Sequence, residues 1–137
     1  MNGFRNQRGS VSIWALLITS GGFAVLLGLV VDGGQLIDAR LEASRVAAQA
    51  ARVGADQLSG SSVRSGSAVV SAQAAVVRVN SYLADAGQSG SVKVTGDRVT
   101  VTITGSSPAS ILSIIGIDSF PIEESATAQG ITGQGSP

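Results

Sequence analysis

The side chains that could perform acid–base or nucleophilic chemistry are few in this chain and poorly placed for it. The sequence contains no His and no Cys, so the commonest general base and the usual zinc ligands are absent. Glu123 and Glu124 are adjacent acids, but successive residues of a strand point to opposite faces and cannot flank one substrate atom. Five serines between positions 59 and 67 lie in loop-like sequence without a base. We therefore expect no enzyme activity, no catalytic residue, no cofactor, no metal site and no small-molecule substrate.

Charge and composition exclude one more class of partner. Nine basic and nine acidic residues cancel, so there is no electrostatic case for nucleic-acid binding. Aromatic residues make up only 4% of the chain, which predicts a thin core. Such a core favours a protein whose partners supply part of its buried surface.

An uncharged run, residues 11–31, dominates the sequence. As an α-helix its 21 residues would span about 32 Å, close to the hydrocarbon thickness of a bilayer. Arg5 and Arg8 precede the run and Asp32 closes it, so the positive-inside rule places residues 1–10 in the cytoplasm. We expect a single-pass anchor in the cytoplasmic membrane, with residues 32–128 forming one extracytoplasmic domain and residues 129–137 a disordered tail.

Three other interpretations of this N-terminal segment are open. It could be the core helix of a soluble protein, although such runs are usually shorter. It could be a cleaved secretory signal, although its apolar part is long and no small-x-small site follows. A third route is cleavage between Gly9 and Ser10, as in prepilins; at the position where pilins of that type usually carry Glu, this chain has Trp14.

The remaining residues predict an α+β domain. An Ala-rich helix continues the membrane helix to about Leu58, with a soft point at Gly33-Gly34. A second helix is expected over residues 68–86, then a hairpin over 91–104 that turns at Gly96-Asp97. Residues 108–116 predict a short apolar helix opened by Pro108. A third strand over 119–129 would complete a small antiparallel sheet of about three strands, with Pro121 suiting an edge strand or a strand start.

The order of these features resembles the TadE/TadG-like family, the pilin-like proteins of the tight-adherence (Flp) pilus assembly system. The matching residues are Arg8-Gly9-Ser10 before the apolar run, Asp32-Gly33 after it, Arg40-Leu41 in the Ala-rich helix, and the strand, Ile-rich turn and closing strand of residues 99–130. The resemblance implies a pilin-like fold and a membrane-anchored pilus subunit or assembly factor. Its implied partners are membrane lipid, other subunits of the pilus or secretion platform, and a second copy of itself. The alternative function is a single-pass envelope binding module unrelated to pili.

Small residues and one acid are the candidate interaction residues. Ala24 and Gly28 form a small-xxx-small pair that could admit a partner helix. Asp32 either marks the end of the span or pairs with a charge of a neighbouring subunit. The Ala stripe beyond the membrane is a further candidate for close helix contact: Ala43, Ala47 and Ala51. The apolar cluster of residues 111–117 must be buried or bound.

Overall fold

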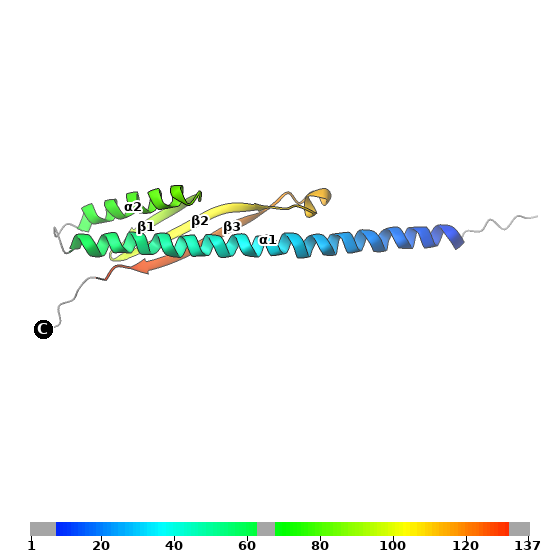
Figure 1. Cartoon of the computed structure of the whole chain (residues 1–137), viewed down its shortest axis with the longest axis horizontal. Coiled ribbons are helices and arrows are strands. Elements are labelled where there is room, and N and C mark those ends of the chain that lie inside the picture. The colour runs from blue at the N-terminus through cyan, green and yellow to red at the C-terminus, as the bar shows by residue number, and fades with distance from the viewer. Residues whose placement is uncertain (1–7, 63–67, 132–137) are drawn as a thin grey trace, which may run out of the picture.

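The computed structural model describes residues 8–62 and 68–131 and has the predicted α+β architecture. Two helices are followed by a three-stranded antiparallel sheet, with a short 3-10 helix before the last strand (Figure 1). The elements are α1 (Arg8–Ser62), α2 (Ala68–Asp85), β1 (Gly90–Thr95), β2 (Arg98–Pro108), η1 (Leu112–Ile115) and β3 (Ser119–Gln129).

A single helix of 55 residues, α1, carries both the apolar run and the Ala-rich segment. It is about 80 Å long and passes Gly33 and Gly34 without interruption, so the predicted soft point does not break it. The helix ends at Ser62, four residues beyond the predicted end at Leu58. Leu58 is buried in the core and the Ser59 hydroxyl bonds to the Ala55 carbonyl at 3.1 Å, so the helix continues into the Ser-rich sequence.

The sheet follows the order β1-β2-β3, with β2 in the centre. The hairpin between β1 and β2 turns at Gly96, whose φ of 61° lies in the left-handed region that favours glycine. Pro121 lies in β3, an edge strand, opposite Ser106. Proline cannot donate a ladder hydrogen bond, so its place on an edge strand agrees with the prediction.

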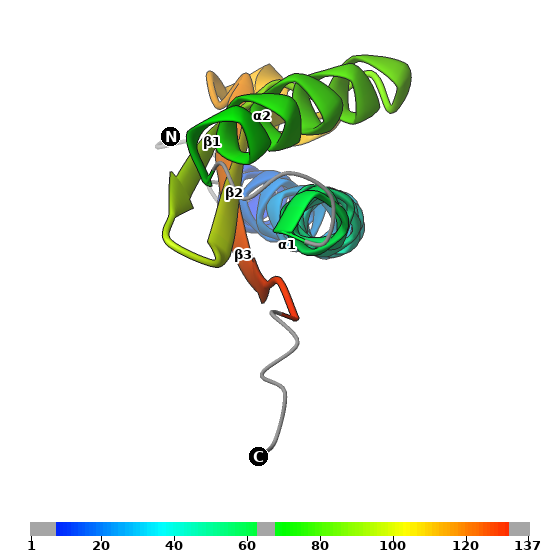
Figure 2. The same cartoon turned by 90° about the vertical axis from the view of Figure 1, so that its left-hand side faces the viewer.

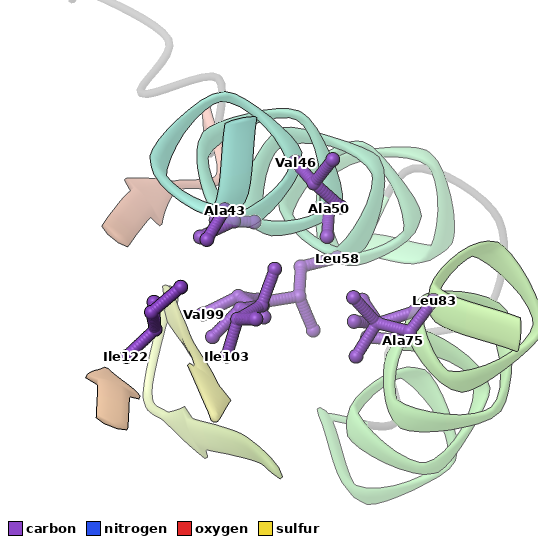
Figure 3. Close-up of a cluster of buried hydrophobic side chains, with 13 residues drawn as sticks. Ala43, Val46, Ala50, Leu58, Ala75, Leu83, Val99, Ile103 and Ile122 are labelled. Carbon is purple, nitrogen blue, oxygen red and sulfur yellow. The ribbon is translucent and has the colours of Figure 1, made fainter. Parts of the chain in front are cut away.

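Both helices pack on one face of the sheet (Figure 2). Inward-facing β2 residues Val99, Val101 and Ile103 are at most 1% exposed and meet alanines of α1 and the apolar face of α2 (Figure 3). On the opposite face a hydroxyl pair joins Thr100 to Thr127 at 2.8 Å. The sheet is therefore apolar toward the helices and polar on its outer face.

Gly54 allows α1 to lie unusually close to α2 and β2. A Cβ added to Gly54 on α1 would lie 2.8 Å from methyl groups of Val79 on α2 and Val99 on β2. Real Cβ atoms do not approach carbon so closely, so α1 contacts both partners at this residue through its bare backbone. The small residues of this stretch allow a chain poor in aromatics to bury a continuous core.

The segment between β2 and β3 differs from the prediction. Pro108 does not open a helix; it is the last residue of β2 and pairs with Ser119 of β3. Only residues 112–115 are helical, in a single 3-10 turn that ends at Gly116 with φ 90°. The difference arises because β2 and β3 stay paired as far as Pro108 and Ser119, and because Gly116, in the left-handed conformation, ends the turn after residue 115.

The strand β3 ends at Gln129 as expected, one residue beyond the expected end of the domain at residue 128. The Gly130 N–H donates to the Asp97 carbonyl at 2.7 Å. The rest of the predicted tail, residues 132–137, lies outside the described residues, as do residues 1–7 of the predicted cytoplasmic segment.

Candidate functional site

The first half of α1 has an apolar surface on all sides. It is the one described helix long and apolar enough to cross a membrane. Its large side chains are exposed around the whole circumference; Trp14 is 67% exposed, Leu16 72% and Val30 73%. A helix that is apolar all round suits lipid, because no face is kept for water.

Two hydroxyl groups within the apolar run are satisfied inside the helix. Thr19 Oγ1 donates to the Ala15 carbonyl at 2.7 Å, and Ser20 Oγ donates to the Leu17 carbonyl at 3.1 Å. In hydrocarbon an unsatisfied hydroxyl would be costly. Both polar groups are therefore compatible with burial in a bilayer.

Asp32, directly after the apolar run, binds the backbone of η1. Its side chain is 1% exposed. Oδ1 accepts the Ser110 N–H at 3.0 Å, and Oδ2 accepts the N–H groups of Ile111 at 3.0 Å and Leu112 at 2.8 Å. One carboxylate thus satisfies three consecutive amides that start a turn about eighty residues later in the chain. We call this contact the Asp32 clamp.

The clamp favours the ionised carboxylate. The Leu112 N–H does most to lower the pKa of Asp32 below its ordinary value, burial of the group opposes this, and the Ser110 and Ile111 N–H groups add to the lowering. Hydrogen bonds to a charged acceptor are stronger than neutral ones. The acid is therefore charged at neutral pH, with its charge held by backbone amides.

Beyond the clamp the turn lies against the apolar half of α1 (Figure 1). A Cβ on Gly28 would lie 2.9 Å from Ile111 Cγ2 and 3.1 Å from Leu112 Cδ2, so only glycine leaves room for the turn here. One turn further toward the N-terminus, Ala24 lines a groove between α1 and the turn. The predicted small-xxx-small pair is thus occupied, in this structure, by the chain's own turn.

The turn also presents an exposed apolar surface. Ile114 is 84% exposed, Ile115 56% and Ile117 40%. Leu112, by contrast, points inward and is buried. We call residues 110–117 the apolar turn; it joins the apolar half of α1 in one continuous surface.

The helix α1, which contains the apolar run and Asp32, also contains the segment that matches a family model. Residues 9–57 match "Tad: Putative Flp pilus-assembly TadE/G-like". The resemblance found in the sequence is confirmed over this segment, which comprises the apolar run, Asp32 and most of the Ala-rich helix. No curated protein and no solved structure matches the chain.

Within the TadE/G-like segment the Ala stripe faces the chain's own domain. Ala43, Ala47 and Ala51 are at most 3% exposed and belong to the core shared with α2 and the sheet. A contact of these residues with another subunit stays a prediction, and it would require the sheet to move aside. Gly9 and Ser10 lie in the first turn of α1, where cleavage likewise stays a prediction.

The acidic residues do not gather into a second site in the described ranges 8–62 and 68–131. No group of three or more His, Cys, Asp or Glu residues there could hold a metal ion. Glu123 pairs with Thr104 and Glu124 with Ile103; because Ile103 is buried against the helices, the two acids lie on opposite faces of the sheet, as predicted.

The Asp32 clamp was missed by sequence reasoning. The local sequence of an acid next to an apolar run is the same whether the acid contacts water, another subunit or a distant turn. The signal that could have found it is the conjunction of two facts: an apolar turn that must be covered, and an uncapped start to that turn. A charge contact of Asp32 with a neighbouring subunit stays a prediction.

Proposed function

We propose that this chain is a membrane-anchored, pilin-like subunit or assembly factor of a tight-adherence (Flp) pilus system. The observation that carries the proposal is the division of α1 into two surfaces. One face of its C-terminal half packs against its own domain, whereas its N-terminal half is apolar and uncovered on most of its circumference. The TadE/G-like match spans that division.

Helix packing is the mechanism that we propose. A side chain such as Leu16 or Ile18 is more than 70% exposed and contacts lipid while the chain is in the membrane. Neighbouring apolar helices can take the place of lipid without loss of hydrophobic contact, and small residues let them approach closely. The N-terminus lies in the cytoplasm and the sheet domain outside it in this proposal, by the positive-inside rule.

Site-specific photo-crosslinking in the native host tests the proposal. A photoreactive residue at Leu16 or Ile18 is expected to give adducts with other subunits of the pilus system. The matched control is Thr127, which is exposed on the outer face of the sheet. Deletion of the gene is expected to reduce piliation; unchanged piliation together with no adduct from either α1 position contradicts the proposal.

The second candidate is a single-pass envelope binding module, favoured by the polar outer face of the sheet. No described element covers the Thr100–Thr127 and Thr102–Ser125 pairs. In this case Thr127 gives the adduct, with a protein outside the pilus system, and the α1 positions give none. The same experiment therefore separates the two candidates.

A further inference from the structure

We propose that the apolar turn, residues 110–117, inserts into the membrane leaflet nearer the folded domain, where Ile114 and Ile115 contact lipid acyl chains. The proposal rests on α1 crossing the membrane and needs no pilus partner.

The turn reaches far along the apolar run. It is held by Asp32 at its base, touches Gly28, and lines a groove with Ala24 and Gly21. From Asp32 to Gly21 is eleven residues, or about 16 Å along a helix axis. The turn therefore lies beside about half of the apolar run.

The helix beyond the turn is too short to cross a bilayer alone. If lipid ended at Gly21, only residues 11–20 of the apolar run would remain, about 15 Å of helix against a hydrocarbon core of about 30 Å. The span cannot be moved toward the N-terminus, because Arg5 and Arg8 precede it and charged residues are costly in hydrocarbon. Lipid that surrounds the whole run must also surround the turn.

The composition of the turn suits that position. Residues 99–117 contain no charged side chain, and the first acid after them is Asp118. Ile114 is 84% exposed. Contact of such a large apolar side chain with water is unfavourable in free energy. In lipid the same surface continues that of α1 without interruption.

Hydrogen bonding lowers the cost of immersing this non-helical segment, because six of its amides have protein acceptors. Irregular backbone is tolerated at membrane depth only when its polar groups are satisfied by protein. Asp32 accepts three amides of the turn, and both serine hydroxyls have protein acceptors. Three further amides bond to carbonyls of the turn itself: Ile114 to Ile111, Gly116 to Ser113 and Ile117 to Leu112, at 3.1–3.2 Å.

Depth-dependent fluorescence quenching tests the proposal on the full-length chain. The sequence has no native cysteine, so Ile114→Cys takes an environment-sensitive fluorophore at one position. The labelled protein is reconstituted in vesicles of phosphatidylethanolamine and phosphatidylglycerol that contain a lipid with an acyl-chain spin label. Leu26→Cys, on the apolar run, is the control inside the membrane, and Lys93→Cys, exposed on β1, is the control outside it.

Quenching of the Ile114→Cys label to the extent found for Leu26→Cys supports the proposal. Quenching as low as for Lys93→Cys overturns it, whether water or protein covers the turn. The native Trp14 is measured in the same vesicles. If Trp14 is quenched and the turn is not, the anchor stands and only the insertion of the turn is wrong. If neither is quenched, α1 does not cross the membrane and the proposal fails with its premise. The pilus role is tested separately, by the crosslinked adducts expected at Leu16 and Ile18.

Discussion

The carboxylate of Asp32 accepts the backbone N–H of Leu112 at 2.8 Å, across a separation of 80 residues. This bond joins the end of the apolar run to the turn between the two long strands. Together with the core packing of the sheet on α1, it holds the turn end of β2 and β3 against the helix. If α1 crosses the membrane as proposed, Asp32 therefore keeps this end of the domain next to the membrane-spanning segment.

Removing the charge of Asp32 is expected to loosen the apolar turn. In Asp32→Asn one acceptor oxygen is replaced by an amide nitrogen, which faces N–H donors instead of accepting from them. Hydrogen exchange of the Ser110, Ile111 and Leu112 amides should speed up by about tenfold or more, measured by mass spectrometry in detergent. Asp38→Asn, at an exposed position of the same helix, should leave these amides unchanged. Equal exchange in both variants would show that the clamp does not hold the turn.

Acid is expected to open the clamp in the same way. The folded pKa of Asp32 is lowered, so its stabilising contribution is complete above the ordinary aspartate pKa of about 3.9 and is lost as the pH falls through the folded pKa. Exchange of the three amides, corrected for the intrinsic pH dependence of exchange, should be constant around neutral pH and rise only in acid below that ordinary value. Asp32→Asn should show no such rise; a rise near neutral pH in the unmodified chain would contradict the assignment.

A side chain at Gly28 is expected to displace the apolar turn. Gly28→Leu places carbon where Ile111 and Leu112 already lie, within 2.9–3.3 Å of the new Cβ; overpacking of this kind typically costs about 1–3 kcal/mol. Gly22→Leu is the matched control, because nothing lies within 4 Å of its Cβ. Faster exchange of residues 110–112 in the first variant alone is the expected result.

Two alanine substitutions should change stability in opposite directions. Gly54→Ala introduces a Cβ 2.8 Å from Val79 and Val99 and should destabilise the domain by about 1–3 kcal/mol. Gly34→Ala has open space around it and should stabilise α1 by up to about 1 kcal/mol, through helix propensity. Chemical denaturation followed by circular dichroism measures both. If Gly54→Ala were as stable as Gly34→Ala, the close approach of α1 to the sheet would be wrong.

Truncation of a side chain on the buried face of β2 is expected to destabilise the domain. Ile103 is 1% exposed at the centre of the sheet, so Ile103→Ala should lower the free energy of unfolding by about 2–5 kcal/mol. The neighbouring Thr102 bonds only across the outer face, to Ser125 at 3.2 Å, and Thr102→Ala should cost about 0.5 kcal/mol or less. Similar losses in the two variants would mean that the buried face of β2 is misassigned.

The elements with a strong local period were predictable from sequence. Val99, Val101 and Ile103 alternate with threonines, which indicates a strand and also shows which face is buried. The turn at Gly96 and the edge position of Pro121 were predictable for a different reason. Glycine adopts the left-handed backbone that a tight turn needs, and proline cannot donate a hydrogen bond inside a sheet. Helix and strand boundaries were less certain, as the extension of α1 to Ser62 shows.

The relationship between distant segments was not predictable in the same way. Ala43 and Gly28 were predicted to allow close approach of a partner helix, but sequence spacing does not say what approaches. In this structure Ala43 packs against the chain's own sheet, and Gly28 contacts the chain's own apolar turn. Asp32 has no local partner at all, and its three donors lie 78–80 residues away. Such contacts depend on the whole topology.

If α1 crosses the membrane as proposed, its unbroken course through Gly33 and Gly34 means that a tilt of the membrane-spanning part tilts the whole helix. The part of α1 from Asp32 to Ser62 extends about 45 Å from the end of the apolar run. A tilt of about 20°, which is ordinary for a membrane helix, moves its far end sideways by roughly 15 Å. The domain packs along this part of α1 and turns with it, so a small change of tilt at the apolar run becomes a large displacement of the sheet.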